Sequence, residues 1–205
     1  MKLYRQTLFI VAMAVATPAL AQTTSTASGA GSATSGPHDH GDAAPPASAE
    51  TKKIFEKLKG LAGSWTGQLT TTPSAPEADG KFVQSAMQVT SRGNAMTHEL
   101  SVSGLPDHPL TMFYLEGDSL ALTHYCDAGN RPHMRGTLSP DGSTLTFDFV
   151  SLDGSNRTGH MHHAVITFID DNHHVEEWTY MMPGDKPVRA RFDLHRTNFQ
   201  TASAR

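Results

Sequence analysis

The stretch that decides the fold runs from Pro109 to Asn130, PLTMFYLEGDSLALTHYCDAGN. Two runs rich in apolar and β-branched residues flank the dipeptide Gly117-Asp118, a pattern typical of a β-hairpin with a tight two-residue turn. Such a turn sets three pairs of facing residues: Phe113 with Leu122, Leu115 with Leu120, and Thr111 with His124. The inner face of this hairpin therefore carries an imidazole beside its apolar side chains.

Similar short strand patterns continue along the chain and predict ten strands. The predicted strands are 64–72, 81–92, 95–104, 110–116, 119–126, 131–138, 144–151, 160–170, 173–182 and 187–197. Ten short strands in sequence order favour an all-β, antiparallel up-and-down barrel, because closure removes the exposed strand edges. A two-sheet sandwich of the same strands is the alternative. One short amphipathic helix, with Ser48 as its N-cap, is predicted before the strands.

The segment before the helix has the composition of an export signal and a tether. Residues 1–21 contain Lys2 and Arg5, a short apolar run and Ala19-Leu20-Ala21, which is the pattern of a cleaved signal peptide. Residues 22–47 are rich in Ser, Thr, Ala, Gly and Pro, so we predict a disordered linker there. The barrel domain is predicted to cover 48–199, and the mature protein to be periplasmic or secreted, with no membrane span.

Charge and cysteine content narrow the classes of partner. Acidic residues outnumber basic ones, 20 to 16, and no basic run follows the signal peptide, which excludes nucleic acid as an expected partner. Cys126 is the only cysteine, so no internal disulfide can form. No oligomeric state follows from the sequence.

The turns also predict which side chains face the interior. A two-residue turn at Gly93-Asn94 places Val89 opposite His98 and points His98 inward. A two-residue turn at Asp171-Asn172 places Glu177 inside the barrel, with Glu176 and Trp178 outside. The longer loops all fall at the other end of the barrel, which is the expected mouth of a ligand cavity.

We therefore predict a small-molecule site in the barrel interior. The predicted ligand-binding residues are His98, Thr111, Phe113, Leu122, His124, Cys126, Phe147, His160, His162, Ile166, Glu177 and Thr179. The apolar members supply the walls, and the polar members orient the polar part of the ligand.

Histidine spacing supports an alternative that is centred on a metal ion or haem. His160 and His162 are two residues apart, so on a regular strand they share one face at a separation of about 7 Å. Two such imidazoles suit a tetrahedral metal ion when His124 or Cys126 supplies the third ligand. Glu177 would then either hold one of these ligands in place or act as general base. Under this alternative the bound group is zinc, copper or haem, and the protein could be a metal-dependent enzyme.

Other histidines have plainer interpretations. His133, His163, His173, His174 and His195 are predicted to lie outward or in turns, where imidazoles are simply solvated. His38-Asp39-His40 is a short run that could hold a metal ion only weakly within a disordered linker. The strong catalytic motifs are absent from the sequence, which favours a binding protein over an enzyme.

The residues Leu61 to Gly67, LAGSWTG, resemble the G-x-W opening of the lipocalin and calycin superfamily. In that superfamily an arginine of the last strand stacks on the tryptophan, and Arg196 matches this position. The ordered region also resembles uncharacterised exported bacterial lipocalin-like proteins and, more distantly, the haem-binding nitrobindin-like barrels. The resemblance implies a cavity for a small, mostly apolar molecule, and it implies structural roles for Gly63, Trp65 and Arg196.

Three functions consequently remain open. The first is an exported protein that binds a small, mostly apolar ligand in a barrel cavity. The second is a metal-centred or haem-centred barrel, including a metal-dependent enzyme. The third is an envelope interaction module whose cavity stays empty.

Overall fold

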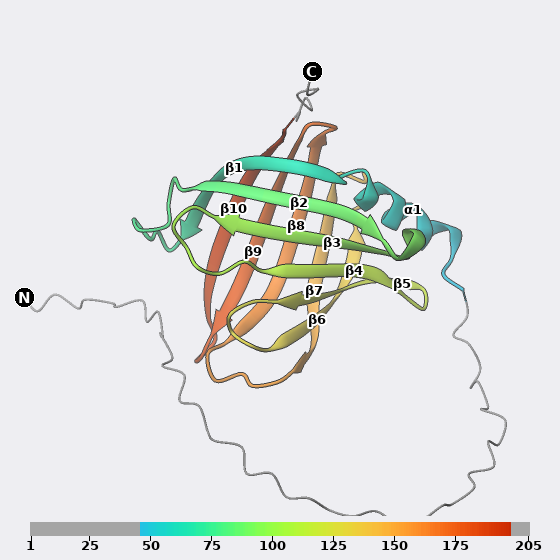
Figure 1. The fold of residues 1–205 in the computed structure, drawn as a ribbon. Coiled ribbons are helices and arrows are strands. Elements are labelled where there is room, and N and C mark those ends of the chain that lie inside the picture. The colour runs from blue at the N-terminus through green and yellow to red at the C-terminus, as the bar shows by residue number, and fades with distance from the viewer. Residues whose placement is uncertain (1–45, 198–205) are drawn as a thin grey trace, which may run out of the picture. The chain divides into compact units, whose positions relative to one another are not determined.

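A computed structural model describes residues 46–197 and shows a closed barrel of ten antiparallel strands preceded by one α-helix (Figure 1). Strands that follow one another in sequence are neighbours in the barrel, and β1 pairs with β10 to close it. The predicted all-β up-and-down barrel is confirmed. The elements are α1 (Ala49–Lys59), β1 (Gly63–Thr72), β2 (Phe82–Thr90), the 3-10 turn η1 (Ser91–Gly93), β3 (Ala95–Val102), β4 (Leu110–Glu116), β5 (Ser119–Tyr125), β6 (Arg131–Leu138), β7 (Thr144–Asp153), β8 (His160–Asp170), β9 (His173–Met182) and β10 (Lys186–Arg196).

Several predictions from the sequence concern other parts of the chain. The signal peptide, nearly all of the linker, the His38-Asp39-His40 run and the last two residues of the predicted domain lie outside the described residues. Within 46–197, no helix has both the length and the apolar character that crossing a membrane requires.

Helix α1 begins at the predicted N-cap and is tied to the tip of the β4–β5 hairpin. The Ser48 hydroxyl accepts a hydrogen bond from the Thr51 amide. The Ser48 amide and the Thr51 hydroxyl both donate to one carboxylate oxygen of Asp118, at 2.7 and 2.8 Å. The buried side chains of Phe55 and Leu58 join the barrel core. The helix therefore packs at the end of the barrel where the tight turns lie (Figure 1).

Trp65 and Arg196 meet at this end, as the sequence predicted. They are directly paired across β1 and β10, and the guanidinium carbon lies 4.2 Å from the indole centroid. The same guanidinium donates to the carbonyl oxygens of Gly60, Ala62 and Asp171. A side chain at position 63 would lie 2.6 Å from the arginine, so this position requires glycine.

The hairpin registers confirm one prediction in full and correct another. The β4–β5 hairpin has the three predicted facing pairs. In the β2–β3 hairpin, however, Val89 faces Met96 and Met87 faces His98, because the connection is a four-residue turn that contains η1. The register differs from the prediction by two residues. A shift of two keeps every side chain on its predicted face, and His98 is indeed buried inside the barrel.

The β8–β9 register is where the predicted faces are wrong. A β-bulge at Ile169 adds one residue to β8, so Ile166 faces Glu176 rather than Glu177. A shift of one residue exchanges the two faces of a strand. Glu176 and Trp178 are therefore buried inside, and Glu177 is exposed outside.

Candidate functional site

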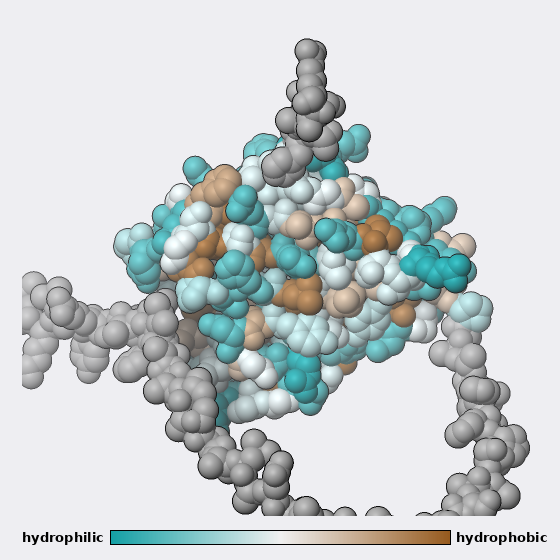
Figure 2. Space-filling view, viewed as in Figure 1, coloured by the Kyte–Doolittle hydropathy of each residue, from teal (hydrophilic) through white to brown (hydrophobic). Residues whose placement is uncertain are grey.

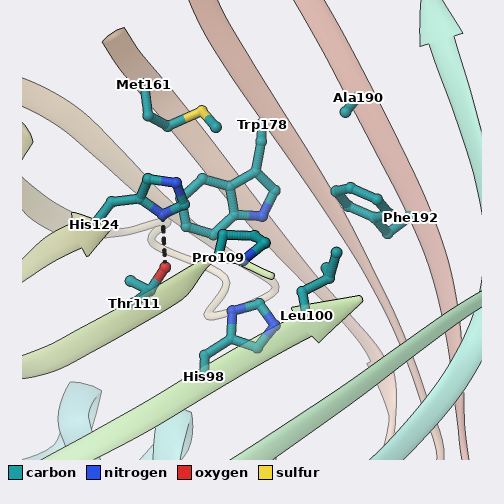
Figure 3. A pocket seen from close by; sticks show the side chains of 9 residues that line it. All are labelled: His98, Leu100, Pro109, Thr111, His124, Met161, Trp178, Ala190 and Phe192. Carbon is teal, nitrogen blue, oxygen red and sulfur yellow. Dashed lines mark hydrogen bonds between the residues drawn. The ribbon is translucent and has the colours of Figure 1, made fainter. Parts of the chain in front are cut away.

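A small cavity lies in the loop half of the barrel, where the sequence predicted a ligand site. Its volume is about 70 Å³. Figure 3 shows side chains from β3, β4, β5, β8, β9 and β10 converging on it. The lining residues are His98, Leu100, Pro109, Thr111, His124, Met161, Trp178, Ala190 and Phe192. The wall is therefore mostly apolar, with two imidazoles and one hydroxyl on one side (Figure 3).

His124 is the polar group whose position is best defined. Its Nδ1 shares a 2.8 Å hydrogen bond with the hydroxyl of Thr111, the residue that faces it across the β4–β5 hairpin. Burial lowers the pKa of His124 to about 4, and the neighbouring His98 adds to the effect. The imidazole is therefore neutral at neutral pH. Its Nε2 is buried without a hydrogen-bond partner among the described residues and lies on the ring side that faces Trp178 and Met161 (Figure 3).

A buried carboxylate stands next to this cavity. Both carboxylate oxygens of Glu176 accept hydrogen bonds, one from Nε2 of His174 at 3.0 Å and one from Nε1 of Trp178 at 2.8 Å. Nε2 of His98 lies 3.5 Å from the oxygen that His174 contacts. The donors His174 and Trp178 point inward from β9, and His98 points inward from β3. The group fixes the orientation of Trp178, whose ring forms one wall of the cavity.

The charge state of this cluster follows from its contacts. Burial by itself would raise the pKa of Glu176, but the charge of His98 and the hydrogen bonds from His174 and Trp178 outweigh burial and hold the pKa at about 2. Burial is also the main influence on His98 and lowers its pKa, although Glu176 opposes that shift. We assign an ionised Glu176, because two N–H groups donate to it and an unprotonated acceptor satisfies both.

The apolar residues that were predicted to contact the ligand lie in the packed core instead of at the cavity. Phe113, Leu122, Phe147 and Ile166 are fully buried in the packed core and do not line the cavity. The rings of Phe113 and Phe147 touch at a centroid distance of 5.3 Å. The structure thus brings only His98, Thr111 and His124 of the predicted set together at the cavity.

His160 and His162 contact each other rather than the cavity. Nδ1 of His160 donates to Oδ1 of Asn156, and Nε2 of His160 lies 3.0 Å from Nδ1 of His162. Both rings pack against Phe149. A second bulge in β8, between Met161 and His163, breaks the regular alternation, and Met161 lines the cavity instead.

The structure does not bring His160 and His162 together with His124 or Cys126, the third ligands predicted from the sequence. Among residues 46–197, no set of three ligand atoms within 4.8 Å of one another includes His124, His160 or His162. A haem also does not fit between His98 and His124, because pockets for ligands of that size measure at least about 300 Å³, far more than the 70 Å³ present.

The remaining predicted site residues lie away from the cavity. Cys126 follows β5 and is half-buried, and burial raises its pKa to about 11, so the thiol is protonated at neutral pH and is a poor nucleophile. Glu177 is exposed and cannot act as an internal base. Thr179 is buried but lies on the strand face opposite Trp178, in register with His163.

Glu176, His174 and Trp178 belong to the site, although the sequence predicted Glu176 and Trp178 to lie outside the barrel and His174 to lie outward or in a turn. They alternate along β9, so the strand alone offers two opposite assignments of its faces. Trp178 lies on the same face of the strand as Glu176. Because a large aromatic ring is more often buried than exposed, Trp178 could have indicated that this face points inward.

The buried neutral His124 makes stability depend on pH. In the unfolded chain an imidazole titrates near pH 6.5, whereas in the folded chain the pKa of His124 is about 4. As the pH falls from about 6.5 to 4, only the unfolded state gains this proton, so the free energy of unfolding is expected to fall by about 3 kcal/mol through this residue.

Urea unfolding of His124→Gln and the parent protein at a series of pH values measures this contribution. Between pH 6.5 and 4, the free energy of unfolding of the variant is expected to fall less steeply than that of the parent, by roughly 1.4 kcal/mol for each pH unit. Above pH 7 the two curves are expected to run parallel, which serves as the internal control. Parallel curves in the acid range as well would show that His124 titrates normally.

Comparison with known proteins supports the fold. No protein-family model matches the sequence, and no curated protein gives a significant match. Among solved structures, Rv2717c from M. tuberculosis aligns with a TM-score of 0.53 at 13% identity, covering 70% of this chain and 97% of that one. A protein of unknown function from the DUF3598 family of Nostoc punctiforme aligns with a TM-score of 0.48 at 12% identity, covering 68% of this chain and 49% of that one. The closed barrel and the first of these similarities fit a calycin-like fold.

Proposed function

We propose that this barrel binds a small molecule, with a mostly apolar body and one or two hydrogen-bonding groups, in the cavity between His98, His124 and Trp178. The observation that carries the proposal is the buried Nε2 of His124, which has no partner among the described residues. A buried polar atom without a partner costs about 1 to 3 kcal/mol. A ligand that hydrogen-bonds to this atom removes that cost while its apolar part covers Leu100, Met161 and Phe192.

The cavity restricts the ligand in size and charge. Its volume of about 70 Å³ is about half that of the roughly 150 Å³ cavity that accepts benzene. The imidazole of His124 is neutral, and an ionised Glu176 lies behind the wall, so an anionic ligand is disfavoured. The site therefore suits a neutral molecule of a few non-hydrogen atoms.

Primary alcohols from methanol to hexanol provide a graded probe of this site. Each added methylene is expected to strengthen binding roughly fourfold, about 0.8 kcal/mol, until the chain no longer fits. Binding is measured from the shift of the His124 ring resonance in NMR spectra of the full-length protein. Because the hydroxyl bonds to Nε2, the same resonance is expected to move for every alcohol that binds.

Ala190→Phe tests whether the alcohols occupy the cavity. The new ring fills the space between Trp178 and Phe192, so the alcohol-dependent shift is expected to disappear. Ala86→Phe is the matched control, since Ala86 lies outside the cavity on β2 and its replacement is expected to leave binding unchanged. Equal shifts in both variants, or none in the parent, would contradict the proposal.

We propose in addition that the protein is exported and belongs with the lipocalin-like barrels. The N-terminal pattern and the pair formed by Trp65 and Arg196 support this. The intact mass of protein isolated from its host is expected to correspond to a chain that begins at Gln22. Native mass spectrometry of the same sample identifies any co-purifying ligand, and an empty barrel would favour the interaction module instead.

A further inference from the structure

Three potential metal ligands converge on the outer face of the barrel, at the strands β9 and β10. They are His173, Asp193 and His195, and their ligand atoms all lie within 4.8 Å of one another. One carboxylate oxygen of Asp193 lies 2.8 Å from Nε2 of His173 and 3.5 Å from Nε2 of His195. The two imidazoles are stacked with centroids 4.2 Å apart. Both Nε2 atoms are therefore directed at the same oxygen.

The strand register holds these residues in place. His173 and His195 face each other across β9 and β10, and Asp193 lies two residues before His195 on the same face. Both strands are paired on both sides in the closed barrel, so their backbone positions are fixed. Two ligands at i and i+2 on one strand, with a third on the neighbouring strand, give a preorganised three-ligand set that needs only side-chain adjustments.

We propose that His173, Asp193 and His195 bind a divalent transition-metal ion, with zinc as the best match. Zinc bonds to imidazole nitrogen and carboxylate oxygen at about 2.0 to 2.2 Å, which places tetrahedral ligand atoms about 3.4 Å apart. The distances of 2.8 and 3.5 Å to the carboxylate oxygen lie on either side of that value. Three protein ligands leave the fourth position of a tetrahedral ion to water.

Metal binding replaces the hydrogen bond between His173 and Asp193. Each histidine binds through Nε2: a neutral ring shifts its Nε2 proton to Nδ1, and a doubly protonated ring releases its Nε2 proton to solvent, so the bound ring is neutral in both cases. Arg191 contacts the second carboxylate oxygen at 3.3 Å and orients Asp193, as groups behind metal ligands commonly do. Its positive charge opposes the ion, whereas Asp170, in register with His173 on β8, adds negative charge.

This site is independent of the interior cavity. His173 and His195 lie on the strand face opposite His174 and Leu194, which point into the barrel. His173 and His195 were predicted to lie outward or in turns as solvated residues. They are 22 positions apart in the sequence and become neighbours only through the β9–β10 register.

Titration with Co²⁺ and Zn²⁺ tests the proposal. The parent is the full-length protein carrying His38→Ala and His40→Ala, which removes the histidines of the N-terminal run. One equivalent of Co²⁺ is expected to produce visible absorption bands typical of a site with nitrogen and oxygen ligands, and Zn²⁺ is expected to displace it. Zn²⁺ is also expected to raise the midpoint of thermal unfolding.

Substitutions at and away from the site decide the outcome. His195→Ala and Asp193→Asn are each expected to weaken metal binding at least about tenfold and to abolish the thermal shift. His163→Ala is the matched control, because His163 also pairs with an aspartate on the outer face, Asp148, at 2.9 Å. Without metal, His195→Ala is expected to unfold like the parent, since His195 is exposed. Equal metal affinity in His195→Ala and His163→Ala, or no binding in the parent, would overturn the proposal.

Discussion

Replacing Glu176 with glutamine is expected to lower the free energy of unfolding by about 3 to 5 kcal/mol, the range seen when one member of a buried charged group is removed. The side chain is fully buried and accepts from His174 and Trp178. A glutamine of the same shape presents one amide group in place of an acceptor, so one of these N–H donors is left without a partner. Urea unfolding followed by tryptophan fluorescence measures the change.

Glu177→Gln provides a matched control in the next residue. It makes the same chemical change on the exposed face of β9, where substitutions usually alter stability by less than about 0.5 kcal/mol. Similar losses in the two variants would mean that the assignment of faces in β9 is incorrect. The comparison therefore tests the register of the strand that carries Trp178.

Trp65→Ala is expected to destabilise the protein by about 3 to 5 kcal/mol, as truncation of a buried tryptophan does. Trp65 fills the tight-turn end of the barrel, and its Nε1 donates to the Leu61 carbonyl. Arg196→Ala is expected to cost about 1 to 4 kcal/mol, because it removes a cation–π contact and leaves the carbonyls of Gly60 and Ala62 without their donors.

The double variant tests whether the two side chains act together. Because Trp65 and Arg196 are in contact, their losses are expected to deviate from additivity by at least about 0.5 kcal/mol. Arg189→Ala, at an exposed position of the same strand, is expected to change stability little and to add to Trp65→Ala without coupling. Additive losses for Trp65 and Arg196 would show that the stacking contributes nothing to stability.

The parts of the fold that could be predicted are those governed by local turn chemistry. The β4–β5 hairpin was predicted to the residue because its turn is a tight two-residue loop at Gly117-Asp118 and neither strand contains a bulge. His98 was placed correctly despite a wrong register, because the error was two residues and a strand repeats every two.

The rest of the site depends on features that leave little trace in the sequence. The bulge at Ile169 reverses the predicted inner and outer faces of β9. The irregularity between Met161 and His163 places Met161 at the cavity, where His160 and His162 were expected. Cavity size could not be predicted either, because it depends on how fully side chains such as Phe113 and Phe147 fill the interior.

The pairing of β1 with β10 has a consequence for how the chain matures. β1 can pair with β2 early, but its second partner, β10, is the last strand to be made, so every shorter intermediate has two unprotected edges. Until β10 is made, the indole of Trp65 also lacks the guanidinium of Arg196 that stacks on it. A chain that ends before Lys186 would therefore be an open sheet that is prone to aggregation and proteolysis. Addition of the final strand pairs both open edges and covers the indole of Trp65.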